Sequence, residues 1–266
     1  MALHKENITQ EPFTFLSPPN WQCGTCGSRP LSFAPKDFLF RDTAGTSNAR
    51  GEEWFEPEMI VERFVGFARC PNANCGEHVR ITGLTSNVLE PDRGSYGESL
   101  VTYLHVDQIT PAPPIIDIPE KCPDAVTAAI TRAFDLYWTD AAAAANAIRQ
   151  AIEALMNRYG VRKFGKDKKT GARVRIPLHN RIDHGFRKKD PGPADSLLAI
   201  KWIGNAGSHE DARPLDRVDV VDAFDLLDHA LEELFVKKAR AKHVTRITTA
   251  VNRAKGPRRR LRKRSS

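Results

Sequence analysis

Two short cysteine pairs constrain this chain more than any other feature of its sequence. Two residues separate Cys23 from Cys26, four separate Cys70 from Cys75, and a glycine follows the second cysteine of each pair. A tight turn of this kind aims two thiolates at one point, and two such turns together complete a tetrahedral four-thiolate site for Zn²⁺. We therefore predict a structural zinc ribbon in which all four cysteines are ligands.

The same cysteines could instead form disulfides. No apolar signal segment precedes Trp21, so we expect a reducing, cytoplasmic setting in which thiols persist. His78 could replace one thiolate, but an ordinary polar residue on the outgoing strand is the simpler interpretation. Cys122 precedes a predicted helix start at Pro123, and we interpret it as a packed structural cysteine rather than a nucleophile.

The spacing of apolar residues divides the chain into two regions. Alternating apolar residues predict strands in the first region, over residues 59–68, 78–84 and 100–109. Residues 1–110 should therefore form a β module that zinc holds together. The proline-rich segment 111–122 is typical of a stiff linker.

From residue 123 to residue 236 the apolar period lengthens to about 3.6, which predicts a helical bundle. Pro123 should open the first helix, Asp140 should cap the second, and Gly160 should end it. A short third helix is expected around Ile182, and two longer ones follow. The fold class we expect is α+β, with the β module first and the all-α bundle second.

The charge of the chain is concentrated at its end. Residues 237–266 contain 13 Lys or Arg and no Asp or Glu, so the rest of the chain is net acidic despite an overall charge of +7. Such a segment repels itself, and we expect a disordered tail that binds polyanions through sequence-independent phosphate contacts. A solubilising role or an acidic protein partner remains open. The predicted contacts are Arg258, Arg259, Arg260 and Arg262.

A second basic cluster lies between the second and third predicted helices, at residues 162–175. Phe164 interrupts the cluster, a combination of charge and aromatic that suits nucleic acid, although an exposed loop of this composition can simply be solvated. The candidate contacts are Lys163, Lys166, Lys168 and Lys169.

The remaining motif is polar and lies on the fourth predicted helix. Helical spacing places Leu198, Trp202, Asn205 and His209 on one face, with Asn205 and His209 one turn apart. His209 could act as an acid or base with Asn205 orienting it or holding a phosphate oxygen. Alternatively the two side chains form a structural pair within the bundle.

The segment from Trp202 to His209, together with the earlier helix 146–155, resembles the prokaryotic domain-of-unknown-function family 4145. That family combines an Arg-x-x-(Leu/Ile)-Glu helix with a later Gly-Asn-x-x-x-His helix, and the resemblance covers about residues 123–236. It implies a setting in nucleic acid metabolism or defence against foreign DNA. The family is similar in turn to the all-helical HEPN superfamily, many of whose members are dimeric, metal-independent ribonucleases. Their signature arginine has no counterpart here, so only Asn205 and His209 are carried over as candidate catalytic residues.

These observations predict an α+β protein with a zinc-ribbon β module, a HEPN-like helical bundle and a basic disordered tail. The expected function is nucleic-acid-associated binding or regulation in bacteria, within phage defence. The alternatives are a metal-independent, HEPN-like ribonuclease that forms a homodimer through the bundle, and a protein-interaction scaffold. The sequence leaves open whether the protein is an enzyme. No apolar run is long enough to span a membrane.

Overall fold

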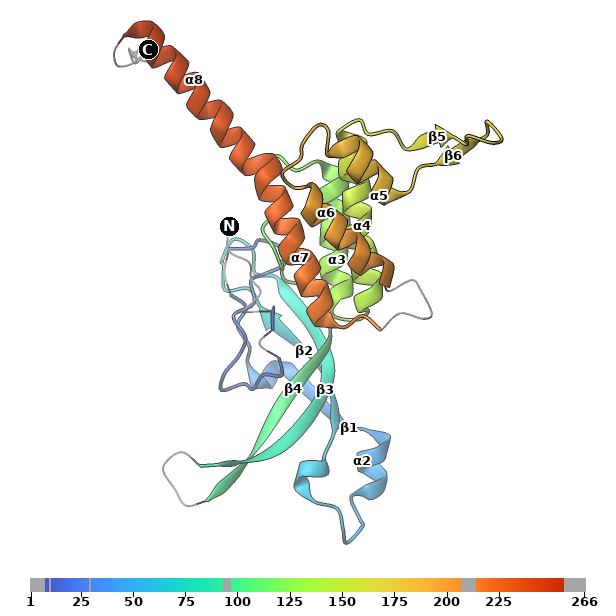
Figure 1. The fold of residues 1–266 in the computed structure, drawn as a ribbon. Coiled ribbons are helices and arrows are strands. Elements are labelled where there is room, and N and C mark those ends of the chain that lie inside the picture. The colour runs from blue at the N-terminus through green and yellow to red at the C-terminus, as the bar shows by residue number, and fades with distance from the viewer. Residues whose placement is uncertain (1–7, 10, 29, 93–96, 207–213, 256–266) are drawn as a thin grey trace.

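The protein has a β-rich N-terminal half and a helical C-terminal half (Figure 1), as the change of apolar period predicts. The structure is a computed structural model, and it describes residues 8–9, 11–28, 30–92, 97–206 and 214–255. Among these residues, no helix is long and apolar enough to cross a membrane.

The N-terminal half is built on one antiparallel sheet with the strand order β1-β2-β3-β4. Side chains alternate between the two faces, so that on β2 Phe64 and Ala68 are buried whereas Val65 and Phe67 are exposed. The pairing of β3 with β4 shifts register at a bulge between Thr82 and Gly83. A Cβ added at Gly83 would lie 1.9 Å from the carbonyl oxygen of His105, so the close approach of the two backbones requires glycine. The strands are β1 Phe38–Asp42, β2 Glu62–Arg69, β3 His78–Pro91 and β4 Glu98–Thr110.

Short elements connect these strands, and β3 and β4 continue beyond the sheet as a two-stranded ribbon (Figure 1). Helix α2 spans Ala44–Ala49, and 3₁₀ turns occupy Pro35–Asp37 and Pro57–Met59. The hydroxyl of Thr43 accepts a hydrogen bond from the Thr46 amide and so caps α2.

The C-terminal half is a bundle in which α4 packs against α3, α6 and α7. Two of the predicted boundaries are confirmed: Pro123 directly precedes α3, and the carboxylate of Asp140 accepts a hydrogen bond from the Ala143 amide at the start of α4. The helices are α3 Asp124–Tyr137, α4 Ala141–Arg158, α5 Leu178–Asn180, α6 Ala194–Ala206, α7 Arg217–Leu231 and α8 Lys238–Ala254. Two π-helical segments, Arg181–Phe186 and Glu232–Lys237, follow α5 and α7.

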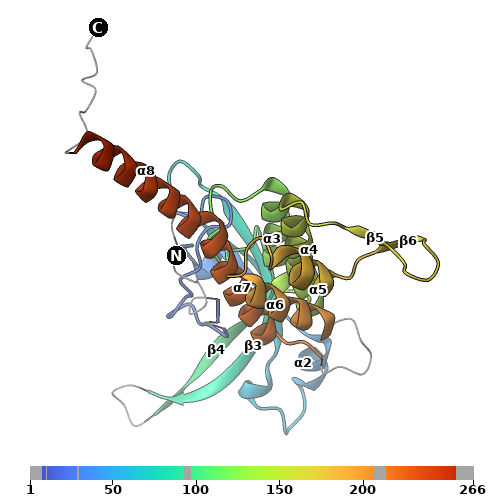
Figure 2. The same ribbon diagram turned by 45° about the horizontal axis from the view of Figure 1, so that its top comes forward.

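The tail that was expected to be disordered is helical over much of its length. Helix α8 continues from α7 through the π-helical segment and projects beyond the bundle (Figure 2), whereas residues 256–266 lie outside the described part of the chain. Charge repulsion favours disorder, but α7 is already anchored, so α8 extends an existing helix without a new nucleation cost. Its Ala, Lys and Arg residues also have high helix propensity.

The two halves share one continuous hydrophobic core. The rings of Trp21 and Trp138 meet edge to face with centroids 4.9 Å apart, one from each half. Ile115 and Ile116, in the segment between the halves, are fully buried. The proline-rich connection is therefore packed into the protein.

Candidate functional site

The four predicted metal ligands lie together at one end of the sheet. All four Sγ atoms lie within 4.8 Å of one another, with 3.9 Å between Cys23 and Cys75 and 3.6 Å between Cys26 and Cys70. Thiolates about 2.3 Å from a tetrahedral ion are separated by about 3.8 Å, whereas a disulfide requires about 2.05 Å. The four cysteines are free thiols, and their spacing fits a metal ion.

Equivalent turns present the two cysteine pairs. Gly27 and Gly76 follow the pairs with φ of 62° and 63°, values that a side chain disfavours. The Gly27 amide donates to the Cys23 carbonyl at 2.8 Å, and the Gly76 amide donates to the Asn72 carbonyl at 2.9 Å. Asn72 thus takes the backbone position that Cys23 holds in the first turn, which explains the longer spacing of the second pair.

The surroundings of the thiols favour different protonation states. A hydrogen bond with Ser28 lowers the pKa of Cys26 to about 6, while burial raises the pKa of Cys70 to about 12. A coordinated cation deprotonates its thiol ligands, so a metal ion would compensate the burial of Cys70.

Cys122 is buried outside this cluster, and burial raises its pKa, consistent with a packed structural role. His78 begins β3 and is exposed, as expected for a residue on the outgoing strand.

The first cysteine turn also contacts the connection between the two halves. A Cβ added at Gly24 would lie 2.3 Å from the carbonyl oxygen of Ala112 and 2.9 Å from that of Pro111. Only glycine allows the turn to approach this closely, so the cysteine cluster is packed against the start of the segment that leads to the bundle.

The basic cluster at residues 162–175 forms a hairpin rather than an irregular loop. Strands β5 Phe164–Lys166 and β6 Arg173–Arg175 pair and project away from the bundle (Figure 1). The guanidinium of Arg173 lies 4.0 Å from the centre of the Phe164 ring, which is 40% exposed. Within the segment 162–175 there are seven Lys or Arg residues and one acidic residue, Asp167.

The acidic residue of the hairpin, Asp167, is hydrogen-bonded within the hairpin turn. The carboxylate of Asp167 accepts hydrogen bonds from the backbone amides of Lys169 and Thr170, which lower its pKa. Arg175 pairs with Glu153 of α4. The four predicted contacts are exposed and form no ion pair within the described residues: Lys163, Lys166, Lys168 and Lys169.

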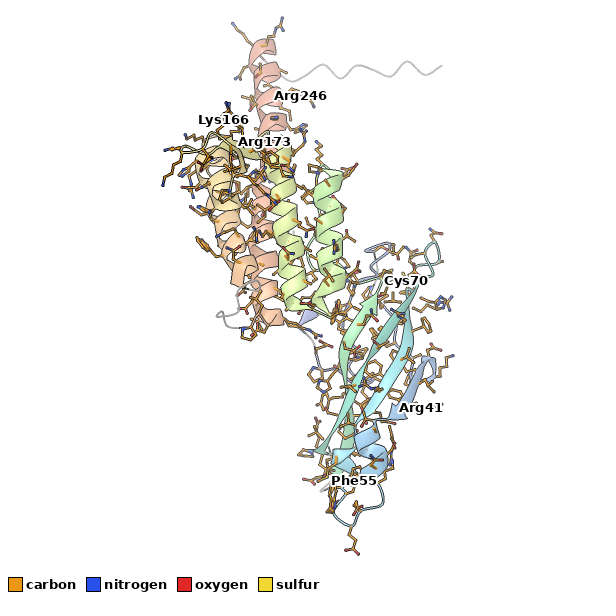
Figure 3. The ribbon with its side chains drawn as sticks, turned by 90° about the vertical axis from the view of Figure 1, so that its right-hand side faces the viewer. Arg41, Phe55, Cys70, Lys166, Arg173 and Arg246 are labelled. Carbon is orange, nitrogen blue, oxygen red and sulfur yellow. The ribbon has the colours of Figure 1, made fainter. Side chains whose placement is uncertain are left out.

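Helix α8 is a second basic projection from the bundle. It contains Lys238, Arg240, Lys242, Arg246 and Arg253 and no acidic residue. Figure 3 shows Arg246 of α8 and Lys166 and Arg173 of the hairpin at one end of the molecule, with Arg41 of the sheet at the other. The predicted contacts Arg258, Arg259, Arg260 and Arg262 lie outside the described residues.

The polar motif of α6 meets the arginine of α4. Arg149 Nη1 donates a hydrogen bond of 3.2 Å to Asn205 Oδ1, which joins the two family-like motifs 56 residues apart. Gly204 makes room for this contact, because an added Cβ would lie 3.3 Å from the Ala145 carbonyl oxygen. His209 lies outside the described residues, so its relation to Asn205 stays a prediction.

The buried face of α6 differs from the predicted one. Trp202 was expected on an apolar buried stripe, but it is 61% exposed, and the face that packs inward contains Leu197, Ile200 and Lys201. Lys201 is 6% exposed, and its Nζ lies 3.3 Å from the centre of the Trp202 ring. Burial, reinforced by the charge of Arg149, lowers the pKa of Lys201. Sequence reasoning missed this buried cation because lysine is normally exposed.

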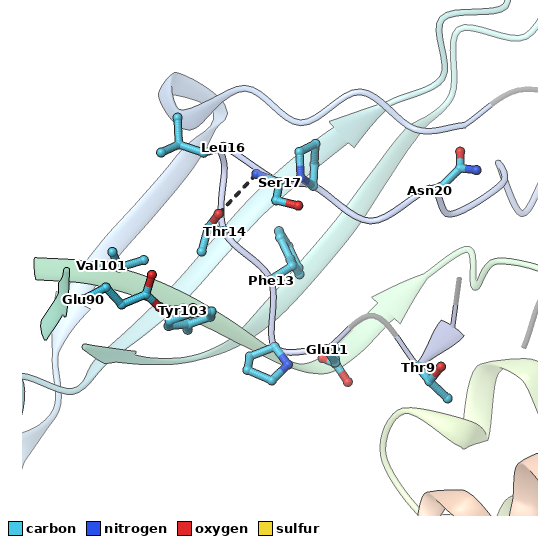
Figure 4. A pocket seen from close by; sticks show the side chains of 12 residues that line it. Thr9, Glu11, Phe13, Thr14, Leu16, Ser17, Asn20, Glu90, Val101 and Tyr103 are labelled. Carbon is cyan, nitrogen blue, oxygen red and sulfur yellow. Dashed lines mark hydrogen bonds between the residues drawn. The ribbon is translucent and has the colours of Figure 1, made fainter. Parts of the chain in front are cut away.

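A groove of about 930 Å³ runs between the N-terminal segment and the β3–β4 ribbon (Figure 4). Within it the Tyr103 hydroxyl donates a hydrogen bond to Glu90, and the Ser17 amide donates to Thr14 Oγ1 at 3.2 Å. The hydrogen bond to Glu90 raises the pKa of Tyr103. None of the predicted site residues lines this groove.

Comparison with known proteins divides the chain in the same way as the fold. Residues 131–250 match the family described as Domain of unknown function (DUF4145), and residues 11–108 match a second, Domain of unknown function (DUF8608). No curated protein and no solved structure matches the chain. The match over residues 131–250 thus confirms the resemblance to the DUF4145 family that Gly204 and Asn205 indicate.

Proposed function

We propose that the protein binds the phosphate backbone of nucleic acid through two basic projections, the β5–β6 hairpin and α8. The hairpin is the main support for this proposal, because its exposed lysines lack carboxylate partners among the described residues. A polyanion would supply the missing counter-charge and release its own condensed cations on binding.

The hairpin also offers a surface for bases. Phe164 and Val174 are 40% and 41% exposed, and cations flank Phe164, with Arg173 4.0 Å and Lys163 6.0 Å from its ring centre. An exposed ring beside cationic groups can stack an unpaired base while the cations contact phosphates. Single-stranded nucleic acid therefore suits the hairpin better than a duplex, whose bases are stacked inside.

The proposed metal is zinc, with a structural role. Four thiolates at tetrahedral spacing match the ligand preference of Zn²⁺ and leave no position open for a substrate. When bound, the ion would cross-link the N-terminal segment to the strands. The ion would be held by Cys23, Cys26, Cys70 and Cys75. Gly24 allows the first cysteine turn to pack against Pro111 and Ala112, in the connection between the two halves.

The experiment that tests the main proposal is a binding titration with a labelled single-stranded oligonucleotide of mixed sequence. Changing Lys166, Lys168 and Lys169 together to Gln should weaken binding at low salt by about tenfold or more. The matched control changes Arg41, Arg63 and Arg69, which are exposed on the sheet, and it should bind as the wild type does. Equal weakening in the two triple variants would indicate a general effect of net charge and would defeat the proposal.

One observation favours a second candidate, a ribonuclease with the active site on α6. Arg149 places a guanidinium beside Asn205, so α4 supplies an arginine that the Gly-Asn-x-x-x-His motif itself lacks. Its Nε is buried and has no hydrogen-bond partner among the described residues, which leaves donor capacity next to the motif. Such a group could stabilise the charge of a cleaved phosphate. Two copies of His209, one from each subunit of a homodimer, would then transfer the protons. RNA cleavage that is lost in both Arg149→Gln and His209→Ala would establish this activity.

A further inference from the structure

A pocket of about 580 Å³ lies at the base of the β5–β6 hairpin. Arg162 just before β5 and Ile176 directly after β6 contribute to its wall, and the π-helical segment contributes the opposite side. π-Helical turns interrupt regular helix packing and often accompany binding sites. Here Gly185 packs closely against Val161. A Cβ added at Gly185 would lie only 2.5 Å from Val161 Cγ1, so this close packing requires glycine.

The lining of this pocket is cationic. Arg162, Arg181 and Lys189 contribute positive charge, His184 contributes an imidazole, and none of its described lining residues is Asp or Glu. Asp183 is outside the lining; it pairs with Arg187 at 2.9 Å and lies 3.5 Å from His184 Nδ1. The pocket therefore presents positive charge and hydrogen-bond donors without a carboxylate of its own.

Arg181 is the pocket residue whose buried charge a bound anion would stabilise most. It is 2% exposed, yet no carboxylate among the described residues pairs with it. Its Nη2 donates to Asn157 Oδ1 at 2.7 Å and to the Val161 carbonyl at 3.2 Å, whereas its Nε has no acceptor in the described part of the chain. Burial lowers the pKa of Arg181, but a guanidinium stays charged in proteins. The carboxylate of Glu153 attracts this guanidinium but is itself paired with Arg175. A buried charge without a counter-ion in direct contact is costly, and a bound anion would lower that cost.

The remaining walls indicate what kind of anion fits. Val161 and Ile176 are apolar, and the volume is several times what a bare inorganic ion occupies and lies within the usual range for organic ligands. Several cations around one pocket favour a dianion over a carboxylate. We propose that this pocket binds a phosphate monoester, with the phosphate on Arg162, Arg181 and Lys189 and the organic group against Val161 and Ile176.

Two sources of such an ester are compatible with the pocket. Because it opens at the base of the hairpin, a strand bound there could place its terminal phosphate in the pocket, and a free nucleotide presents the same group. Only the first source rests on the proposed function, since a free nucleotide needs no contact with the hairpin.

The test compares a 5′-phosphorylated oligonucleotide, the same oligonucleotide with a 5′-hydroxyl, and adenosine monophosphate, each titrated against the full chain. The terminal phosphate should strengthen binding about tenfold, because charge-assisted hydrogen bonds form only with the phosphorylated end. Lys189→Ala should abolish this advantage. The matched control, Lys188→Ala, changes the adjacent exposed lysine outside the pocket and should preserve it. Arg181→Lys retains the buried charge but not the planar donor group, and it should also lose the advantage.

The outcomes separate this inference from the proposed function. Binding of adenosine monophosphate that depends on Lys189, without any oligonucleotide binding, would support the pocket and defeat the hairpin proposal. Oligonucleotide binding that ignores the terminal phosphate, together with no binding of adenosine monophosphate, would overturn the pocket assignment and leave the hairpin proposal standing.

Discussion

Arg217, the first residue of α7, forms an ion pair with Glu11, which lies 206 residues earlier in the chain. The Nη1–Oε2 distance is 2.5 Å, and Arg217 Nη2 also donates to the carbonyls of Val106 and Trp138 at 2.9 and 2.7 Å. The other carboxylate oxygen of Glu11 accepts from the Val106 amide. One guanidinium therefore connects the N-terminal segment, strand β4 and the end of α3.

Substitution of Arg217 should destabilise the whole protein. Arg217→Ala leaves a mostly buried carboxylate and two carbonyls without their donor, and we expect a loss of about 1–3 kcal/mol in the free energy of unfolding. The control is Arg50→Ala, which removes an arginine that also pairs with one carboxylate, Asp42, but is more exposed, and it should cost clearly less than Arg217→Ala. Equal losses in chemical denaturation would show that Arg217 has no special role at the junction.

Glu11 should make the stability of the junction depend on pH. Burial raises the pKa of Glu11 above its usual 4.5, although Arg217 opposes the shift. An acid with a raised folded pKa contributes stability fully below its unfolded pKa, and this contribution is lost as pH rises through the folded pKa. The unfolding free energy of wild type minus that of Glu11→Gln should therefore fall as pH rises above the ordinary glutamate pKa of 4.5. A difference that grows with pH would mean that pairing with Arg217 outweighs burial.

Removal of one cysteine ligand should release the metal. Purified protein should contain about one zinc ion per chain, and Cys26→Ser should lose it, because three remaining thiolates no longer close the tetrahedral site. Cys122→Ser changes the remaining buried cysteine and should retain zinc. Elemental analysis decides between these outcomes, and full zinc content in Cys26→Ser would remove this cysteine from the ligand set.

The contact between Arg149 and Asn205 should contribute to stability. Asn205→Ala removes the acceptor of a half-buried guanidinium whose Nε has no partner among the residues that the structure describes, so we expect a loss of about 1–3 kcal/mol. Asn146→Ala, at an exposed position of the adjacent helix α4, should change stability by less than about 0.5 kcal/mol. Unchanged thermal stability in Asn205→Ala would instead assign the pair to ligand binding.

Local signals in the sequence account for the features that were predicted correctly. The cysteine pairs, the cap at Asp140 and the start of α3 after Pro123 each depend on a few neighbouring residues. The β5–β6 hairpin was missed because its strands are only three residues long and too charged to show an alternating pattern. The charge density of residues 237–266 predicts disorder, but α8 forms because it extends helix α7, which precedes it and is anchored in the bundle.

Other features depend on contacts that no local pattern reveals. The partners of Arg217 lie in three distant segments, and nothing around residue 217 distinguishes it from a surface arginine. Lys201 is buried because α6 turns a different face inward from the one that Leu198 and Trp202 indicate. The pocket around Arg181 likewise arises where the hairpin and the π-helical segment meet.

The salt dependence of nucleic acid binding tests the central proposal most directly. If the hairpin lysines contact phosphates, neutralising Lys166, Lys168 and Lys169 should flatten the slope of log affinity against log salt concentration by about 2–3 units. Neutralising Arg240, Lys242, Arg246 and Arg253 of α8 in the same protein should flatten it further. The sheet variant with Arg41, Arg63 and Arg69 replaced should keep the wild-type slope. A wild-type slope in the hairpin variant would contradict the proposal that this hairpin holds the nucleic acid backbone.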